Sequence, residues 1–517
     1  MRSNGFPKSS SSPQSSGTAT SDAAVRAVQS ALDQCPTPGV PPKTNPWHDL
    51  LYDRLRAEAL PALICDETIT PAASLWTGSR LWTQAFRSTD LRAGDRLVIA
   101  LPPSTAFVQV LVAALWEGLT VALAPPETNP EALLNSLDGR AVVTTESTVT
   151  PDTAPHAFVS EEYAGPRSTP STLRPPDTSP TPDVRFVLRT SGTTAHARWI
   201  ALSDRNVLSV LASHLPHLSL HDARVLSVLP WTHTFGLVLD LFPALFSGAE
   251  IIRDPKGGRD PEHLIQLRNA WGGTHLSTVP LTIQRLTDTP SGDALLRDLK
   301  GGIVGGAPVS GPLAEQLSQT TLRAGYGQTE AAPGIALGAP GEWTAHYLGQ
   351  PVGCTVTLAE DGELLFEGPN ACVGVWRDGT LDRADPNRTV HTGDLVERRG
   401  DDLYFRGRKD DRFKLSNGRW VQAGAMEATL KTSFPDLRDA LVFTPNGDDV
   451  AVALCPDSSA AALPSPDDVR TILGSLAERL VWTTTIAPDA WTTLAKGTVD
   501  RNAMTETLSE TYRSSSP

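Results

Sequence analysis

The hydrophobic pattern between residues 95 and 320 alternates between short apolar runs and longer segments with a helical period. An apolar run at 95–101 is followed by a helical segment at 104–119 and then by a second run, "TVALA". The succession repeats with strands in "RVLSVLP", "AEIIR", "THLSTVP" and "GGIVGG" and with helices at 236–247, 262–271 and 311–319. It predicts an α/β fold, with a large N-terminal domain of mainly parallel sheets covered by helices. Such sheets bind ligands at loops leaving the carboxyl ends of strands.

The pattern changes near both ends of the chain. After about residue 400 it becomes charged and rich in turns, and two apolar strands ("DALVFTP" and "DVAVALCP") and a helix at 467–480 follow. We therefore expect a large domain at 47–406 and a small, mobile C-terminal α+β domain at 407–517. Residues 1–46 are rich in Ser, Gly and Pro, and are expected to form a disordered tail. The polar segment at 166–183 is expected to be an exposed connector.

Composition narrows the class of protein. The 517 residues suffice for two domains, and the net charge of −14 disfavours binding to nucleic acid or to anionic membranes. No segment approaches the ~18 to 20 unbroken apolar residues of a membrane helix, and the first residues lack the apolar core of a signal peptide. The five cysteines are scattered without a CxxC pair, which indicates neither a zinc site nor a disulfide framework. A cytoplasmic protein without a membrane span is expected.

The stretch "RTSGTTAHARW" at 189–199 is the first candidate for chemistry. It follows the strand-like "VRFVLR" and precedes a helix for which Ser203 is the expected N-cap. Backbone N–H groups and hydroxyls from Thr190 to Thr194 can surround phosphate oxygens, and Arg198 can add a bidentate contact. An exposed Ser/Thr turn is the competing interpretation.

Four further segments carry candidate residues, each with a plainer alternative. "GYGQTE" ends in Thr329 and Glu330, and its carboxylate can hold Mg²⁺ between phosphates; a tight turn with a surface glutamate is the alternative. Asp394 in "HTGDL" can accept two sugar hydroxyls, or it is a turn aspartate. "GRKDDRFKLSNGRWV" is either a site segment or a solvated hairpin, and Lys496 in "LAKGTVDR" is either functional or a surface lysine.

Together these segments give the chain a family resemblance. With "GGAP" at 305–308 and "LPWTHTFGL" at 229–237, the segments "TSGTT", "GYGQTE", "TGDL" and "GRKDDRFK" resemble the adenylate-forming superfamily. This superfamily contains acyl-CoA synthetases, luciferases and peptide-synthetase adenylation domains. The resemblance runs from about residue 50 to 505.

The resemblance implies a role for each matching position. The cofactor-binding residues would be Thr190, Ser191, Gly192, Thr193 and Thr194 at the ATP phosphates, Gly305, Gly306, Ala307, Pro308 and Tyr326 at the adenine, and Asp394 and Arg408 at the ribose. The catalytic group would comprise Lys496, Thr329, Arg198 and the magnesium ligand Glu330. The acyl pocket would be bordered by Trp231, His233, Gly236, Gly302 and Ala324, with Gly301 nearby, and Asp410 would be the hinge.

Two departures from the family pattern concern cations. The phosphate loop of the family continues Gly-x-Pro-Lys-Gly, where this chain has Ala195, His196, Ala197, Arg198 and Trp199. The family also places a lysine three residues before an arginine near the C-terminus. Counting back from Arg501 gives Thr498, and the nearest lysine is Lys496. We expect the long side chain of Lys496 to reach the same place; the alternative is a weakened or lost first step.

The resemblance implies an AMP-forming acid–thiol ligase that uses ATP, Mg²⁺ and CoA. A carboxylic acid would be activated to an acyl-adenylate and then transferred to the thiol. Transfer to the phosphopantetheine of a free-standing acyl carrier protein is the first alternative. A non-catalytic relative that binds nucleotide or acyl-adenylate is the second, and a luciferase-like or amide-forming reaction remains. Fatty and aromatic acids both fit as substrates.

Overall fold

The computed structural model describes residues 17–35, 41–56, 62–65, 68–145, 156–159, 182–190, 198–377, 379–434, 436–457, 463–493 and 499–515. Most of the predicted connector at 166–183 falls outside these ranges. Among the residues described, no helix is long and apolar enough to cross a membrane.

The first large sheet carries the strand before the predicted phosphate loop. Its strand order is β19-β18-β8-β7-β4-β3-β5-β6, and the neighbours from β7 to β6 pair in parallel. The strands are β3 (Arg96–Ala100), β4 (Thr120–Leu123), β5 (Ala141–Thr144), β6 (His156–Val159), β7 (Phe186–Arg189), β8 (Trp199–Leu202), β18 (Gly374–Arg377) and β19 (Thr380–Arg383). The predicted order of strand, helix and strand at 95–124 is confirmed by β3, β4 and the intervening helix.

Two further sheets complete the large domain. The second has the order β11-β9-β10-β1-β2, and four of its strands pair in parallel: β1 (Leu63–Cys65), β9 (Arg224–Ser227), β10 (Glu250–Arg253) and β11 (His275–Ser277). Its antiparallel edge strand is β2 (Thr68–Thr70). The third has the order β12-β13-β14-β15-β21-β20-β17-β16.

The third sheet departs from the expectation of mainly parallel sheets. Only β12 and β13 pair in parallel, and the other neighbours are antiparallel. Its strands are β12 (Ile303–Gly305), β13 (Arg323–Gly327), β14 (Gly334–Leu337), β15 (Tyr347–Pro351), β16 (Thr355–Leu358), β17 (Glu363–Glu367), β20 (Val390–Arg399) and β21 (Asp402–Arg408). After β13 the links between consecutive strands carry no helical crossover of the kind that parallel neighbours require, which favours antiparallel pairing.

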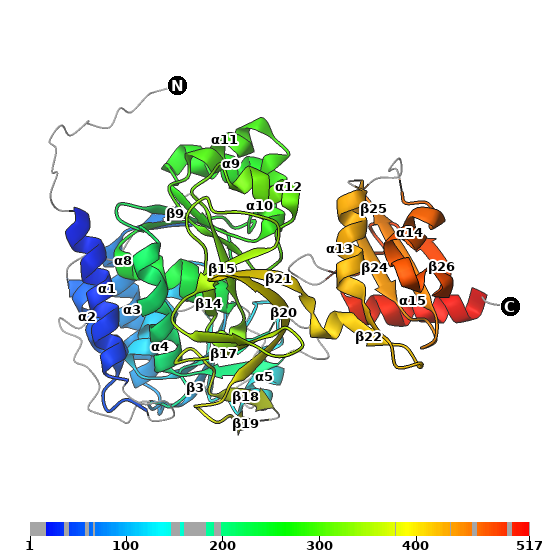
Figure 1. Cartoon of the computed structure of the whole chain (residues 1–517). Helices are drawn as coiled ribbons and strands as arrows, with labels where there is room; N and C mark the ends of the chain where they lie inside the picture. Colours follow the sequence, from blue (N-terminus) through cyan, green and yellow to red (C-terminus); the bar gives the residue numbers. More distant parts are fainter. Residues whose placement is uncertain are drawn as a thin grey trace.

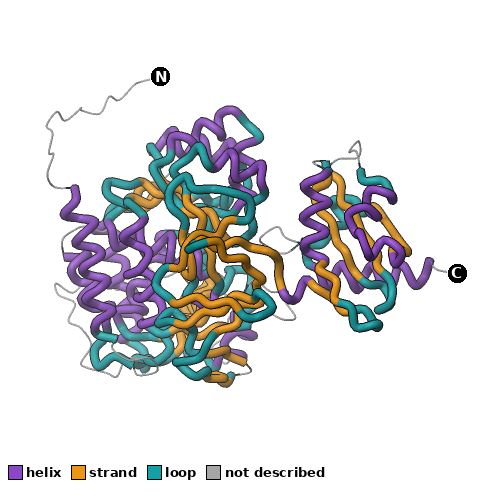
Figure 2. The backbone as a smooth tube through the Cα atoms, in the orientation of Figure 1, coloured by secondary structure: helices purple, strands orange, loops and turns teal. Residues whose placement is uncertain are grey.

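Helices cover the first two sheets (Figure 2). The largest hydrophobic cluster joins several of these helices to strands β3, β4 and β7. The helices of the large domain are α1 (Gly17–Asp33), α2 (Pro46–Arg56), α3 (Ala72–Arg87), α4 (Thr105–Trp116), α5 (Pro130–Leu137), α6 (Asp204–His214), α7 (Thr234–Gly236), α8 (Phe242–Ser247), α9 (Pro261–Trp271), α10 (Pro280–Thr287), α11 (Pro290–Asp298) and α12 (Gly311–Leu317).

The expectation of a disordered tail over 1–46 is wrong for the residues that form helix α1, Gly17–Asp33. Helix α1 buries Ala24, Val28 and Ala31, which recur at the spacing of one helical face and belong to the main hydrophobic cluster. The prediction failed because these small apolar residues are few and are separated by polar ones. The Ser-rich and Pro-rich sequence on either side also has the composition of a disordered segment. The packed N-terminal segment therefore begins before Trp47.

The predicted helix at 236–247 is divided into three parts. Helix α7 is followed by a π-helical turn, η2 (Leu237–Leu241), and then by α8. Pro243 lies in the first turn of α8, where its missing N–H removes a bond that a continuous helix would need. The Leu, Val and Phe residues of the whole segment 236–247 are buried, as expected for the core-facing residues of a helix.

The small domain follows the expected α+β pattern. It contains a hairpin of β22 (Arg412–Lys414) and β23 (Trp420–Gln422) and a three-stranded sheet of β24 (Leu437–Phe443), β25 (Val450–Pro456) and β26 (Leu480–Thr485). Its helices are α13 (Ala423–Ser433), α14 (Pro466–Leu473) and α15 (Arg501–Ser515). In Figure 1 this domain lies to one side of the large domain and is joined to it beyond β21. Two hydrophobic clusters, formed by residues of the small domain, give it a core of its own.

Candidate active site

The predicted phosphate loop closes a β-hairpin. Strands β7 and β8 pair antiparallel, with Arg189 opposite Trp199. At the tip, the Thr190 N–H donates to the Arg198 carbonyl at 2.9 Å, and the Arg198 N–H donates to Thr190 Oγ1 at 3.1 Å. Ser191 to Thr194 lie outside the described residues.

Arg198 and Glu330 join two different sheets. Arg198 follows the hairpin tip, whereas Glu330 lies in the short helix η3 (Thr329–Ala331) directly after β13. The Arg198 guanidinium donates to Glu330 Oε1 at 2.9 Å, and the two side chains are 53% and 16% exposed. The predicted cation and the predicted magnesium ligand are therefore brought together, within reach of solvent and of an entering ligand.

Thr329 is held beside a segment that sequence analysis assigned to the acyl pocket. Its hydroxyl lies 3.5 Å from that of Thr234, the first residue of α7. The Glu330 carbonyl accepts from the Cys372 N–H at 2.9 Å, which ties η3 to the segment before β18. Thr234 lies within the predicted acyl segment, but its contact with Thr329, 95 residues away, leaves no local pattern in the sequence.

The residues predicted for the nucleoside form one hydrogen-bonded group. Tyr326 donates its hydroxyl proton to Asp394 Oδ2 at 2.7 Å, and Arg408 donates to Asp394 Oδ1 at 2.8 Å. Asp394 is buried in strand β20, directly opposite Arg408 on β21. Burial and the nearby Asp394 carboxylate raise the pKa of the Tyr326 phenol well above its usual value, so Tyr326 remains a donor.

The "GGAP" segment lies beside this group. Gly305 ends β12 and pairs in parallel with Gly325 on β13, so both strands present their carboxyl ends at the same edge. A Cβ on Gly305 would approach the Gly325 carbonyl oxygen to 2.5 Å, and Gly306 has a φ of +85°. The backbone therefore requires both glycines, and Ala307 and Pro308 follow them directly after β12.

Glu363, which was not among the predicted site residues, holds the backbone directly before Asp394. Glu363 on β17 is buried, and its carboxylate accepts from the Gly393 N–H at 3.0 Å and from Lys409 at 2.6 Å. Lys409 also pairs with Asp361 at 2.8 Å. It directly precedes Asp410, the predicted hinge, whose side chain lies outside what the structure describes. These contacts fix the large-domain end of the hinge segment.

The acyl-pocket candidates divide into two groups. His233 and Ala324 lie near the site: His233 precedes α7, and burial and the charge of Arg189 lower its pKa below the usual value. Gly302 has a φ of +143°, and a Cβ there would meet the Leu276 carbonyl at 1.9 Å. Gly236 is equally constrained, with a Cβ 2.2 Å from the Pro230 carbonyl, so both glycines serve close backbone packing.

Trp231 does not face an open pocket. Its side chain is 0% exposed, its indole N–H donates to Ser227 Oγ at 3.0 Å, and the Arg253 guanidinium lies 5.4 Å from the ring centre. Its predicted place at the border of the acyl site stays a prediction, and its ring packs against Phe107 in the hydrophobic core. Its place in the sequence, in a loop before a helix, did not reveal that its ring packs into the core.

Lys496 and Thr498 lie outside the described residues, but the residues around them are placed. Thr493 and Val499 form an antiparallel bridge. The next arginine, Arg501, forms ion pairs with Glu427 of α13 and with Asp411 beside the hinge. Arg501, which follows the Lys496 segment, therefore contacts the hinge segment within the small domain.

Comparison with known proteins identifies the family of the chain. The family described as AMP-binding enzyme matches residues 59–376. Feruloyl-CoA synthase from Amycolatopsis is 27% identical over 342 residues, covering 62% of this chain and 69% of the relative. Anthranilate–CoA ligase from Pseudomonas aeruginosa is 27% identical over 386 residues, covering 68% of this chain and 74% of the relative. For two further CoA ligases, the match covers 44% and 46% of the relative's length.

A solved structure shares the fold over most of the chain. ATP-bound MatB from Rhodopseudomonas palustris aligns with a TM-score of 0.75 at 21% identity, covering 90% of this chain and 99% of MatB. The match to the family extends over more than half of the chain and includes Thr190, Glu330 and the "GGAP" turn. The protein therefore belongs to the family of AMP-binding, adenylate-forming enzymes.

Proposed function

We propose that this protein activates a carboxylic acid with ATP to an acyl-adenylate and transfers the acyl group to the thiol of CoA. The observation that carries the proposal is the convergence of Arg198, Glu330 and the Asp394 group at adjoining strand ends. A cation, a magnesium-type carboxylate and a hydroxyl-binding carboxylate in one place suit a nucleoside triphosphate.

The Asp394 group would bind the ribose. Its carboxylate is held by Tyr326 and Arg408, so it cannot rotate away, and a carboxylate can accept two vicinal hydroxyls. The turn after Gly305 would lie along the adenine. Thr190, at the start of the loop, places its hydroxyl at the end of β7, where the phosphates would bind.

Glu330 fits a magnesium ion. Mg²⁺ in nucleotide sites is usually held by one or two carboxylates together with phosphate oxygens, and Glu330 offers one partly exposed carboxylate. When bound there, the ion would offset negative charge on the phosphates. Arg198, displaced from Glu330, would then be free to contact a phosphate with its planar guanidinium.

The first step joins two anions. A carboxylate oxygen of the acid would attack the α-phosphorus of ATP, and the bond to pyrophosphate would break. Cations must offset the charge that gathers there, and Arg198 and Lys496 are the side chains assigned to this role. Removing one such group typically costs on the order of a hundredfold in rate.

The second step exchanges AMP for a thiol. The sulfur of CoA would attack the acyl carbonyl, the bond to AMP would break, and the thiol proton would pass to solvent. We assign the change between steps to rotation of the small domain at Asp410, which would withdraw Lys496 and admit the thiol. The Lys409 contacts with Asp361 and Glu363 provide the fixed end for such a rotation.

Thioester formation with a panel of acids tests the proposal. The protein would be incubated with ATP, Mg²⁺ and aryl or fatty acids, with CoA or with a pantetheinylated carrier protein, and products identified by mass spectrometry. The feruloyl and anthranilate names of the relatives favour aryl acids as the first panel. An acyl-CoA supports the proposal, whereas a product formed only on the carrier protein replaces CoA as the acceptor. ATP binding without any product favours a non-catalytic relative, for which Thr498 in place of lysine is the supporting feature.

A further inference from the structure

The hairpin that carries the predicted phosphate loop is closed at its base by a buried ion pair. Arg185 precedes β7 and Asp204 follows β8 as the first residue of α6. Arg185 donates to both carboxylate oxygens of Asp204, at 2.8 and 3.1 Å, and the two side chains are 0% and 1% exposed. The pair is thus bidentate, shielded from solvent and located at the end of the hairpin opposite to Thr190.

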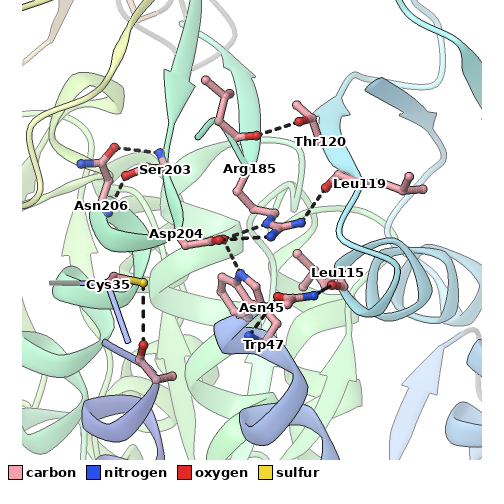
Figure 3. Close-up of polar contacts among 12 residues, drawn as sticks. Cys35, Asn45, Trp47, Leu115, Leu119, Thr120, Arg185, Ser203, Asp204 and Asn206 are labelled. Atoms are coloured by element: carbon pink, nitrogen blue, oxygen red, sulfur yellow. Dashed lines mark hydrogen bonds and ion pairs between the residues drawn. The ribbon is translucent and has the colours of Figure 1, made fainter. Parts of the chain in front are cut away.

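The same arginine fixes the hairpin to the parallel sheet. Its remaining terminal nitrogen donates to the Leu119 carbonyl at 3.0 Å, directly before β4. Thr120 donates its hydroxyl proton to the Val184 carbonyl at 2.7 Å, and the Arg185 N–H donates to the Leu202 carbonyl at 2.8 Å. Figure 3 shows the Arg185 guanidinium between Leu119 and Asp204, with its contacts to both drawn as dashed lines. Position and register of the hairpin are therefore set at this point.

A third donor comes from the N-terminal segment. Trp47 of α2 donates its indole N–H to the Asp204 carboxylate, and its ring packs at 5.8 Å from Phe186 and at 5.4 Å from Phe242. The Trp47 N–H donates to the Asn45 side chain, and the Asn45 amide donates to the Leu115 carbonyl at 2.7 Å. Figure 3 shows Trp47 reaching toward Asp204 and Asn45 toward Leu115.

Register at the base determines what the hairpin presents at its tip. Side chains alternate between the two faces of a strand, so a slip of one residue between β7 and β8 would reverse the faces of every residue beyond it. The four residue steps from Arg185 to Arg189 span ~13 Å along the strand, at ~3.3 Å per residue. Arg198 reaches Glu330 in the observed register, and a buried ion pair satisfied only in one arrangement can specify that register.

We propose that Trp47, Arg185 and Asp204 form an anchor that positions the phosphate loop for ATP. The N-terminal segment is then part of the nucleotide-binding apparatus, although it lies far from the nucleotide. Trp47 acts as a positioning residue: it orients Asp204, Asp204 orients Arg185, and together they fix the hairpin. The ATP part of this inference rests on the proposed function, whereas the ordering of the hairpin does not.

The chain offers a matched pair of variants. Trp47→Phe removes the indole N–H that reaches Asp204 and leaves an aromatic ring in place. Trp116→Phe makes the same change at a residue that is 1% exposed in the same hydrophobic cluster. Within the described part of the chain, the Trp116 indole N–H is buried without a hydrogen-bond partner. Asp204→Asn would leave a buried guanidinium without its counter-charge and is expected to unfold the domain, so Trp47→Phe is the decisive variant.

Two measurements test the anchor. Hydrogen–deuterium exchange of peptides within 186–202, in protein without nucleotide, should be roughly tenfold faster in Trp47→Phe than in Trp116→Phe. The dissociation constant for ATP with Mg²⁺ should rise about three- to tenfold in Trp47→Phe, at a temperature where both variants remain folded. Equal exchange in the two variants overturns the proposal, as does faster exchange with unchanged ATP affinity. If the wild-type protein binds no ATP, the proposed function is contradicted. Hydrogen–deuterium exchange alone then tests whether Trp47, Arg185 and Asp204 order the hairpin.

Discussion

The guanidinium of Arg198 lies 2.9 Å from the carboxylate of Glu330, although 132 residues separate them in the sequence. One follows the hairpin of the first sheet, and the other follows β13 of the third sheet. The pair brings the cation of the phosphate loop to the proposed magnesium ligand before any nucleotide binds. In the proposed reaction, Mg²⁺ bound with ATP would compete with Arg198 for the Glu330 carboxylate.

Neutralising this carboxylate should impair the reaction through the metal. Glu330→Gln removes the charge that attracts both Mg²⁺ and Arg198, and keeps the size of the side chain. We expect pyrophosphate release to slow about a hundredfold and to require more Mg²⁺ for half-maximal rate. A magnesium titration of initial rates measures both effects. Glu315→Gln, on the exposed face of α12, is the control. If Glu330→Gln needs no more Mg²⁺ than the wild type for half-maximal rate, Glu330 is not the magnesium ligand.

Loss of the Asp394 charge should weaken nucleotide binding more than turnover. Asp394→Asn leaves Arg408 without the carboxylate and deprives the ribose of a charged acceptor. The KM for ATP should rise at least about tenfold, because hydrogen bonds to charged groups are stronger than neutral ones. Tyr326→Phe, which removes a single donor to Asp394, should show a smaller change in the same direction. Initial rates at varied ATP test this, with the exposed Asp382→Asn as control; equal KM values for Asp394→Asn and wild type would exclude the ribose role.

The sequence predicted the elements of the large domain well where periodicity and capping agree. Ser203 was expected as an N-cap, and it caps α6 in a capping box with Asn206. The segment after Gly334 was harder, because its strands pair antiparallel across short links and not around helices. The motif residues Thr190, Glu330, Tyr326 and Asp394 were named, but Glu363, which holds the Gly393 N–H and Lys409, was not. Contacts made across tens of residues depend on the assembled sheets and leave no local signal.

The role of Lys496 can be tested by moving the lysine. Lys496→Ala should reduce pyrophosphate release by about a hundredfold while ATP affinity changes little, because the cation acts on the developing charge and not on the ground state. Adding Thr498→Lys to this variant should restore much of the rate, since it places a lysine three residues before Arg501. Kinetics of the single and double variants, with the exposed Lys43→Ala as control, decide the matter. Wild-type rates in Lys496→Ala would exclude the assignment.

A buried carboxyl beside the predicted acyl segment should make stability depend on pH. Burial raises the pKa of Asp240, in the π-helical turn, from 3.8 to about 7, although Ser227 donates a hydrogen bond to it. Between these values the unfolded chain loses a proton that the folded chain keeps, so the Asp240 contribution to stability falls as the pH rises. Asp240→Asn cannot ionise.

The melting temperature of Asp240→Asn minus that of wild type should therefore increase from pH 4 to about pH 7 and then level off. Thermal unfolding at a series of pH values provides the measurement. Asp222→Asn serves for comparison, because that side chain is 88% exposed. A difference that stays constant over this range would mean that Asp240 is already ionised in the folded protein at low pH.

Acid-dependent exchange of labelled pyrophosphate into ATP tests the central claim most directly, because it reports the first step without any thiol. With Mg²⁺ and a suitable aryl or fatty acid, the wild-type protein should catalyse exchange, and Asp394→Asn and Lys496→Ala should be strongly impaired. Exchange in the wild type alone would establish adenylation at this site. Wild-type protein that binds ATP but shows no exchange with any acid of a broad panel would contradict the proposed reaction.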